Sequence, residues 1–190
     1  TTFPSIGAAP TGLNFVLFDK STGSPGMSTQ TIYVGVKGTG IYQSVNGGTT
    51  WTLINGSPLN PRRVVLAGDG TLYVTYDTGV TKFANGVWTD ITPPASGRYN
   101  GITVDPTNPN IVMTAIEDGS ITPAPIYRST NGGLNWTQIT FVKHPDVPWW
   151  TSNWFAANTS TLTIDPHFPK RVWLTDFYGT WRTDDITASP

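Results

Sequence analysis

The chain consists of short runs in which apolar and polar residues alternate, and Asp, Asn, Pro or Gly stands at most joints between the runs. In one stretch the alternation predicts four strands, at 101–104, 111–116, 126–129 and 135–140, which are rich in β-branched and aromatic residues. Nowhere do the apolar residues recur with the period of a helix. The pattern therefore predicts an all-β fold of short strands joined by turns.

The same group of strands recurs along the chain. The segment Ile41–Ile54 returns as Ile126–Ile139, and a shortened copy at Gly79–Ile91 keeps the Asn-Gly turn and the Trp. Repeats of this length with four strands each are typical of β-propeller blades, because one small sheet cannot bury both of its faces. We expect residues 1–190 to form one segment of a propeller, with a Trp-rich insertion at 141–159 and blades at approximately 11–56, 61–93, 99–140 and 160–190.

The third turn of the repeat has the pattern Ser-x-Asn/Asp-x-Gly-x-x-Trp, known as an Asp box. Its Asn side chain can accept hydrogen bonds from amides of its own hairpin, its glycines permit a positive φ, and its Trp is expected to fold back over the turn. We expect a structural role for these residues rather than a ligand-binding role. In the two best copies they are Ser44, Asn46, Gly48, Trp51, Ser129, Asn131, Gly133 and Trp136.

The order of the strands assigns the turns to two faces. The first turn of a blade, marked at 105–110 and 165–170 by the pattern Asp-Pro-x-x-Pro, lies on the same face as the Asp box. The second turns and the connections between blades then lie on the opposite face, where loops of several blades meet and a ligand would bind. The carboxylates expected on that opposite face are Asp77, Glu117, Asp118, Asp146 and Asp176.

The insertion carries three tryptophans, Trp149, Trp150 and Trp154, on the same face. Flat aromatic rings stack well on the apolar C–H faces of sugars, which would make the insertion a binding platform. A local hydrophobic cluster that holds a long loop in place is the alternative, and both roles stay open.

Charge and composition exclude several kinds of function. With 11 Lys and Arg against 12 Asp and Glu, the chain offers no polycationic face for nucleic acid. No apolar run approaches the ~18 residues that span a bilayer. The absence of Cys removes disulfides and thiolate metal sites, and no segment has metal-ligand spacing or a nucleotide-binding motif, so we expect neither a metal nor a cofactor.

Localisation rests on weaker signals. The first residue is Thr1 rather than Met, which indicates either a removed signal peptide or a cut from a longer chain. Three Asn-x-Ser/Thr sequons, at Asn55, Asn135 and Asn158, are compatible with secretion. We expect a secreted protein.

Two pairs of segments resemble glycoside hydrolase family 74, whose members are xyloglucanases and related endo-β-1,4-glucanases. The pairs are Val104–Asn110 with Ile126–Gly133, and Ile164–Pro169 with Trp181–Ile186. The resemblance covers nearly the whole chain. It implies a protein of two large propellers with the glucan in the cleft between them, in which a pair of Asp residues inverts the anomeric centre. The 190 residues would account for about four of fourteen blades.

The resemblance also points to one candidate catalytic residue. Catalytic Asp residues of the family lie in Thr-Asp-x-Gly-Gly or Gly-Asp-x-Gly-Gly loops, and the nearest match is Thr175–Gly179, which contains Asp176 but lacks the first Gly. The same segment also resembles a non-catalytic blade of the family, in which case both catalytic residues lie outside the chain. The expected substrate-binding residues are Trp149, Trp150, Trp154, Tyr178, Glu117, Asp118 and Asp77.

The sequence is compatible with two functions. In the first, the chain is part of a secreted glycoside hydrolase acting on β-1,4-glucan or xyloglucan and contributes glycan-binding subsites without activity of its own. In the second, it is a non-catalytic propeller module that binds a glycan or a protein. Expected partners are a polysaccharide or oligosaccharide and the remaining blades of a parent protein or other copies of the chain. A small closed ring of four blades is a third arrangement.

Overall fold

The computed structural model describes residues 12–117, 124–141 and 158–188, which form four antiparallel sheets and one short 3₁₀ helix, η1 (Lys20–Thr22). The first sheet contains β1 (Leu13–Phe18), β2 (Ile32–Val36), β3 (Gly40–Ser44) and β4 (Thr52–Leu53). The second contains β5 (Pro61–Leu66), β6 (Leu72–Tyr76), β7 (Gly79–Ala84) and β8 (Val87–Asp90). The third contains β9 (Tyr99–Val104), β10 (Val112–Ile116), β11 (Ile126–Ser129) and β12 (Thr137–Gln138). The fourth contains β13 (Thr161–Ile164), β14 (Val172–Thr175) and β15 (Thr180–Thr183).

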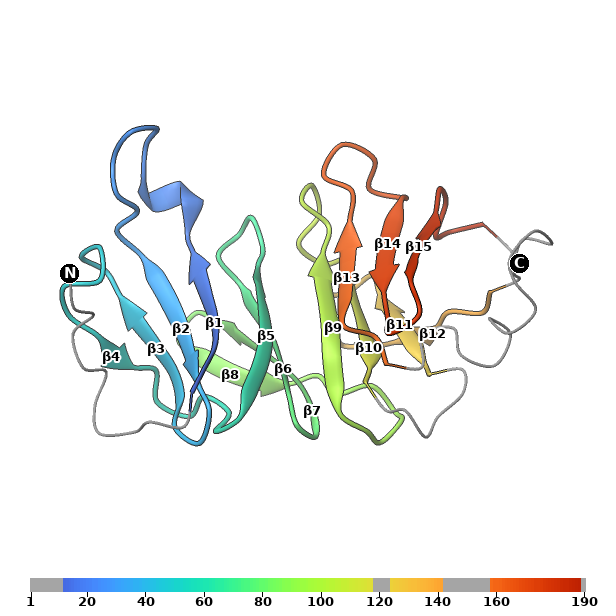
Figure 1. Ribbon diagram of the computed structural model, residues 1–190, viewed down its shortest axis with the longest axis horizontal. Coiled ribbons are helices and arrows are strands. Elements are labelled where there is room, and N and C mark those ends of the chain that lie inside the picture. The colour runs from blue at the N-terminus through green and yellow to red at the C-terminus, as the bar shows by residue number, and fades with distance from the viewer. Residues whose placement is uncertain (1–11, 118–123, 142–157, 189–190) are drawn as a thin grey trace.

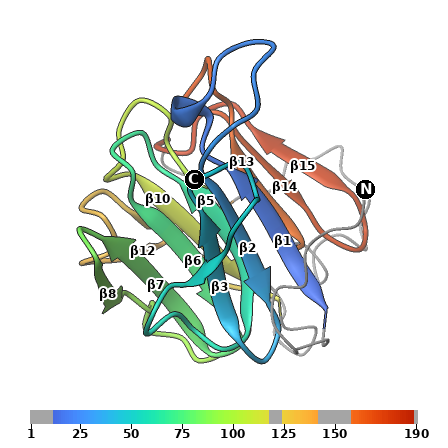
Figure 2. The ribbon, with the colours of Figure 1, turned by 90° about the vertical axis from the view of Figure 1, so that its left-hand side faces the viewer.

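Each sheet is a meander in which every strand pairs with the next one along the chain. The four sheets stand side by side in an arc, and their first strands, β1, β5, β9 and β13, contact one another in that order (Figure 1). Seen from the side of the first sheet, the later sheets lie behind it (Figure 2). This arrangement is that of propeller blades around an axis, and the all-β prediction is confirmed.

The core consists of three separate apolar layers, one at each junction between neighbouring sheets of the described chain. The first layer holds Ile41 and Val74, the second holds Val80 and Tyr99, and all four side chains are buried. The third layer, between the third and fourth sheets, is built on residues such as Ile126, Leu162, Ile164, Val172 and Leu174. Every inner sheet therefore buries both of its faces, which is why the sheets must stack to be stable.

The predicted turn chemistry of the first turns is confirmed. The Oδ1 atom of Asp105 accepts the N–H groups of Thr107 at 2.7 Å and Asn108 at 3.2 Å. Asp165 does the same for His167 at 2.9 Å and Phe168 at 3.2 Å. The hydrogen bond from the His167 N–H is the main cause that lowers the pKa of Asp165 below its ordinary value.

Three predicted strand ranges in the third sheet are wrong at their ends: the strand expected at 101–104 is β9, which begins at Tyr99, and two other strands lose end residues to local turns. The strand expected at 135–140 is only β12, Thr137–Gln138, because the Asn135 N–H is used inside the turn, where it donates to Asn131 Oδ1 at 2.9 Å. The strand expected at 111–116 begins at Val112, since the Ile111 N–H turns back to the carbonyl of Asn108 at 3.0 Å. In both cases a local turn takes a main-chain N–H that the strand would have used.

Candidate functional site

The two best Asp boxes form the same hydrogen bonds. Ser129 Oγ accepts the N–H groups of Gly133 at 2.9 Å and Asn131 at 3.2 Å, and it donates to Asn131 Oδ1 at 3.0 Å. The first box repeats each of these bonds with Ser44, Asn46 and Gly48. The polar atoms of the motif are therefore engaged by their own loop, in agreement with a structural role.

The indoles of the repeat have a contact that the sequence did not indicate. Trp136 donates its Nε1–H to the main-chain carbonyl of Ile91, in the preceding sheet, at 2.6 Å. Trp88 likewise donates to the carbonyl of Asn55, just after the last strand of the sheet before its own, at 3.1 Å. The expectation that the Trp lies over its own turn is thus incomplete, since these two indoles also join one sheet to the next.

The face opposite the Asp boxes is made of the second turns of the sheets and the connections between sheets. In Figure 1 the β1–β2, β5–β6, β9–β10 and β13–β14 connections follow the upper edge of the arc, and the β2–β3 and β6–β7 turns follow the lower edge. Asp77 follows β6 and Glu117 follows β10, so both carboxylates lie at the lower edge. The assignment of the turns to two faces agrees with the strand order.

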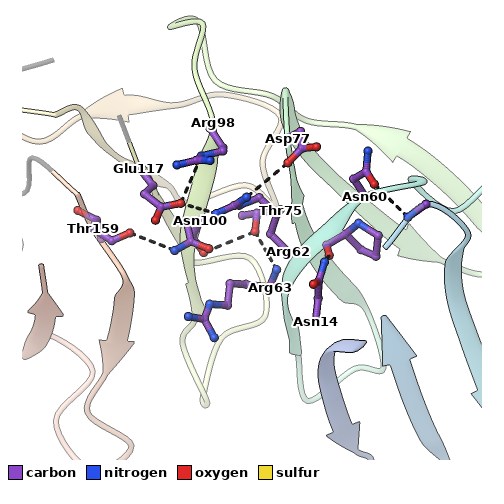
Figure 3. A network of polar contacts seen from close by, with 12 residues as sticks. Asn14, Asn60, Arg62, Arg63, Thr75, Asp77, Arg98, Asn100, Glu117 and Thr159 are labelled. Carbon is purple, nitrogen blue, oxygen red and sulfur yellow. Dashed lines mark hydrogen bonds and ion pairs between the residues drawn. The ribbon is translucent and has the colours of Figure 1, made fainter. Parts of the chain in front are cut away.

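A network of charged residues joins the second and third sheets at this edge (Figure 3). The guanidinium of Arg62, from β5, binds Asp77 of its own sheet through Nη1 at 3.4 Å and Glu117 of the next sheet through Nη2. Arg98 contacts the same Glu117 oxygen through Nε at 3.3 Å. The side chains of Arg62 and Glu117 are only 23% and 15% exposed, against 46% for Asp77 and 52% for Arg98. The pair of Arg62 and Glu117 is therefore shielded from solvent, whereas Asp77 and Arg98 face the solvent.

The network continues as neutral hydrogen bonds within the second sheet and from it to the next sheets. The Arg63 N–H donates to Thr75 Oγ1 at 3.1 Å, and Thr75 Oγ1 donates to the carbonyl of Asn100 at 3.5 Å. The Asn100 amide in turn donates to the carbonyls of Thr159 and Ser160, each at 3.4 Å, ahead of the fourth sheet (Figure 3). Three consecutive sheets are thus tied together at one edge, which holds the charged groups in a defined geometry.

Asp176 lies on the corresponding turn of the fourth sheet, between β14 and β15. Its Oδ1 accepts the N–H groups of Tyr178 at 2.8 Å and Gly179 at 2.9 Å, and its Oδ2 accepts the indole N–H of Trp181 at 2.8 Å. Phe177 and Tyr178 beside it are 71% and 42% exposed. The carboxylate is fixed by its own turn and is flanked by exposed aromatic rings.

The structure brings some of the predicted site residues together. Asp77 and Glu117 meet at Arg62, and Asp176 accepts hydrogen bonds from its own turn and from Trp181 of β15. The other predicted residues, Trp149, Trp150, Trp154, Asp118 and Asp146, lie outside the described residues. Their roles stay predictions, as does that of Asp176.

Arg62, Arg98 and Asn100 were missed by the sequence analysis. Each lies at or just before the start of a first strand, on the face that the strand order had singled out. Two adjacent Arg residues at 62 and 63, in a chain with only 11 Lys and Arg, were the available signal. Basic residues on that face therefore indicated the two arginines, whereas no comparable signal marked Asn100.

Two features of the described residues bear on cofactors and membranes. Among these residues, no group of three or more His, Asp or Glu side chains lies close enough together to hold a metal ion. None of the helices in the same ranges is long and apolar enough to cross a bilayer.

The chain is similar in sequence to xyloglucanases. It is 37% identical over 203 aligned positions to a xyloglucanase from a Paenibacillus species, covering 94% of this chain and 19% of the relative. It is 42% identical over 151 positions to Xyloglucanase Xgh74A of Acetivibrio thermocellus, covering 67% of this chain and 18% of the relative. The chain thus spans about a fifth of the length of these relatives. No protein-family model matches it.

Solved structures agree with the sequence comparison. The GH74 enzyme of Niastella koreensis superposes with a TM-score of 0.78 at 33% identity, over 94% of this chain and 30% of that one. The GH74 xyloglucanase of Xanthomonas campestris superposes with a TM-score of 0.79 at 28% identity, over 94% of this chain and 29% of that one. The structure of YCF48 bound to D1 peptide superposes over 98% of this chain with a TM-score of 0.63, but at 14% identity this likeness shows the fold alone.

Proposed function

Because the chain corresponds to about four blades of a xyloglucanase-like propeller of glycoside hydrolase family 74, we propose that it is part of a secreted glycoside hydrolase acting on β-1,4-glucan or xyloglucan. Its four sheets are consecutive blades of one segment, and the remaining blades belong to the parent protein. The single observation that carries the proposal is the sequence identity to xyloglucanases over nearly the whole chain.

Glycan binding is assigned to the edge that carries the charged network. Sugar hydroxyls both donate and accept hydrogen bonds, and the paired groups at Arg62, Asp77 and Glu117 offer donors and acceptors side by side. Exposed aromatic rings at Phe177 and Tyr178 add flat apolar surfaces on a turn of the same kind. These two types of group are what a site for a neutral polysaccharide requires. The chain alone is expected to bind the glycan but not to hydrolyse it.

Asp176 is the proposed carboxylate of this segment for the reaction. An inverting glycosidase needs one carboxylic acid to protonate the leaving oxygen and one carboxylate to activate water, with the two groups about 6.5–9.5 Å apart. The three N–H donors around Asp176 fix its position, which either role requires. The second carboxylate would come from another part of the parent protein.

The parent protein provides the test of Asp176. Hydrolysis of xyloglucan and thermal unfolding are compared for the parent, Asp176→Asn, and the control Asp165→Asn on the opposite face. A catalytic role predicts a fall in kcat of at least ~100-fold at nearly unchanged KM. A purely structural role predicts a lower unfolding temperature with kcat retained, and that result would remove Asp176 from the reaction.

Binding by the 190-residue chain is tested separately. Calorimetric titration with xyloglucan oligosaccharides should show saturable binding, and replacing Trp149, Trp150 and Trp154 by Ala should weaken it at least ~10-fold if each stacked ring contributes about 0.5–1.5 kcal/mol. Retained affinity in the triple variant would assign these residues to a hydrophobic cluster instead.

A non-catalytic propeller module is the second candidate, and one observation favours it. Glu117 is engaged by two guanidinium groups and Asp176 by its own turn, which are the contacts of structural carboxylates. Hydrolysis by the parent protein separates the two candidates. Turnover that an Asp→Asn change abolishes excludes a pure binding module, whereas a parent without turnover excludes the hydrolase.

A further inference from the structure

Asn is followed directly by Gly at five positions of the chain, and this pair of residues is prone to spontaneous deamidation. The main-chain nitrogen of the Gly attacks the side-chain amide of the Asn and closes a succinimide ring, a reaction that a side chain on the second residue would hinder. Because the chemistry is the same at every pair, the local backbone decides which of them reacts. The five residues are Asn46, Asn55, Asn85, Asn100 and Asn131.

The hairpin between β7 and β8 has the backbone closest to ring closure. Its pairing of Ala84 with Val87 leaves Asn85 and Gly86 as the turn residues, with φ of 52° and 79°, which is a type I′ turn. Closing the ring requires ψ of about −120° at the Asn, as at the first central residue of a type II′ turn. The two turns differ chiefly in the orientation of the peptide between the central residues. A flip of that one peptide therefore brings the Gly86 nitrogen to the Asn85 amide while the strands stay paired.

The surroundings of this turn leave room for the flip. Asn85 and Gly86 are both exposed, and a Cβ placed on Gly86 would meet no heavy atom within 4 Å. Within the described chain, neither the Asn85 side chain nor the Gly86 N–H has a hydrogen-bond partner. The turn is the shortened Asp box, in which Phe83 stands at the place of Ser44 and Ser129. It therefore lacks the hydroxyl that closes the two complete boxes.

The complete Asp boxes hold the same pair in an unreactive arrangement. The N–H groups of Gly47 and Gly132 each donate to a main-chain carbonyl outside the box at 2.9 Å. The Oδ1 atoms of Asn46 and Asn131 each accept two hydrogen bonds from their own loops. Both the nitrogen that would attack and the amide that it would attack are therefore engaged.

Contacts between sheets restrain the other two pairs. Asn100 is buried in β9, and its amide donates to main-chain carbonyls ahead of the fourth sheet. Asn55 is exposed, but its carbonyl accepts the indole N–H of Trp88 at 3.1 Å, which fixes the peptide that would have to rotate. Among the non-Gly residues of the described ranges, only Asn85 has a positive φ.

We propose that Asn85 is a deamidation site of this protein. The Gly86 nitrogen forms a bond to Cγ of Asn85, the bond from Cγ to the side-chain nitrogen breaks, and that nitrogen leaves as ammonia with the proton that Gly86 loses. One water molecule then opens the succinimide at either carbonyl and leaves aspartate or isoaspartate at this position. The isoaspartate form carries the former Cβ in its main chain, which lengthens the turn. This site is independent of any glycan-binding role.

The modified turn affects the contact between the first two sheets. β8 follows the turn directly, and its Trp88 lies against Phe83 with ring centroids 4.8 Å apart and donates to the Asn55 carbonyl. A longer main chain at position 85 shifts β8 along β7 and displaces both contacts. We expect the isoaspartate form to unfold at a lower temperature than the unmodified chain.

The test incubates the full 190-residue chain at mildly alkaline pH, which speeds deamidation, both folded in buffer and unfolded in urea. Peptide mapping by mass spectrometry follows each pair, and isoaspartyl methyltransferase labels the isoaspartate. In the folded chain Asn85 should react at least ~10-fold faster than Asn46 and Asn131, because those two pairs must first break hydrogen bonds. In urea, where the local structure is lost, the pairs should react at similar rates.

Asn85→Gly is the matched control, since Gly accepts a positive φ and has no side-chain amide. After the same incubation the unmodified chain should unfold at a lower temperature, in proportion to its isoaspartate content, and Asn85→Gly should not change. A folded chain in which Asn46, Asn55 or Asn131 reacts as fast as Asn85, or in which Asn85 reacts only in urea, would overturn the proposal. An isoaspartate form that keeps its unfolding temperature would overturn the effect on the contact between sheets.

Discussion

The indole N–H of Trp136 donates a 2.6 Å hydrogen bond to the main-chain carbonyl of Ile91, a residue of the preceding sheet. The Asn and Ser of the same Asp box are used inside their own loop. One motif therefore has two tasks, because its polar residues close the turn and its aromatic residue fastens that turn to a neighbour. This second contact joins the third sheet to the second sheet.

Trp136→Phe should lower the free energy of unfolding by ~1 kcal/mol, because it leaves the Ile91 carbonyl without its donor while keeping an aromatic ring. Trp136→Ala should cost about 3 kcal/mol, since the packing at the junction is lost as well. Urea denaturation gives both values. Trp173→Phe, at a ring that is 38% exposed on the outward face of the fourth sheet, is the control and should change little. Equal stability of Trp136→Phe and the unmodified chain would contradict the role given to this hydrogen bond.

Gly133→Ala and Gly48→Ala form a matched pair. Both glycines have a positive φ, of 86° and 88°, so Ala is strained equally at either position. A Cβ at Gly133 would lie 2.6 Å from Cδ1 of Ile91 in the preceding sheet, whereas at Gly48 the nearest atom is in Trp51 at 3.5 Å. We expect Gly48→Ala to cost ~1 kcal/mol from backbone strain, and Gly133→Ala a further 1–3 kcal/mol from overpacking. Thermal or urea unfolding measures the difference. Equal costs would show that the packing between the second and third sheets rearranges to accept the added methyl group.

A double-mutant cycle on Arg62 and Glu117 should show a coupling of about 1 kcal/mol, because the two side chains are shielded and belong to different sheets. Arg62→Met and Glu117→Gln are the single variants, and unfolding in urea is the measurement. The pair of Arg62 with the exposed Asp77 is the internal comparison, and Asp77→Asn should change stability by less than ~0.5 kcal/mol. A coupling near zero would mean that the network positions side chains without stabilising the fold.

Stability should fall at alkaline pH through Tyr99. Burial raises the pKa of this tyrosine above its ordinary value of 10, and its hydroxyl donates to the carbonyl of Ala95 at 2.5 Å. The unfolded chain loses this proton near pH ~10, so the stability contributed by the neutral phenol is complete below that pH and is lost as the pH rises toward the higher folded value.

Tyr99→Phe isolates this contribution. The variant should be less stable by ~1 kcal/mol at pH 7, from the lost hydrogen bond, and should lose less stability than the unmodified chain between pH 9 and pH 11. Unfolding free energies across this range are the measurement. Tyr178→Phe, at a side chain that is 42% exposed, serves as the control. Parallel alkaline profiles for Tyr99→Phe and the unmodified chain would show that another group causes the loss.

Much of the local structure could be predicted from the sequence. The strand β11 spans the predicted range 126–129, and the Asp105 and Asp165 turns form the expected hydrogen bonds. The two faces of the segment also followed from strand order alone. These features depend on residues within a few positions of one another, so a single repeat contains all the information that they need.

The candidate site could be predicted only in part. Sequence order placed Asp77 and Glu117 on one face, but nothing in it indicated that Arg62 would bind both of them. For Asp176 the family resemblance suggested catalysis, while the structure adds that its oxygens accept hydrogen bonds from its own turn and from Trp181 of β15. Such contacts depend on side-chain positions that a motif does not encode.

By itself, then, the sequence of this protein determined that it is made of four repeated antiparallel sheets, where their turns fall, and which turns share a face. Only the tertiary structure decided how neighbouring sheets are joined, by Trp136 on Ile91 and by Arg62 between Asp77 and Glu117. The reason is physical. Strand and turn formation depends on local periodicity and backbone geometry, whereas a contact between sheets depends on the packing of residues tens of positions apart, which is set only when the sheets stack.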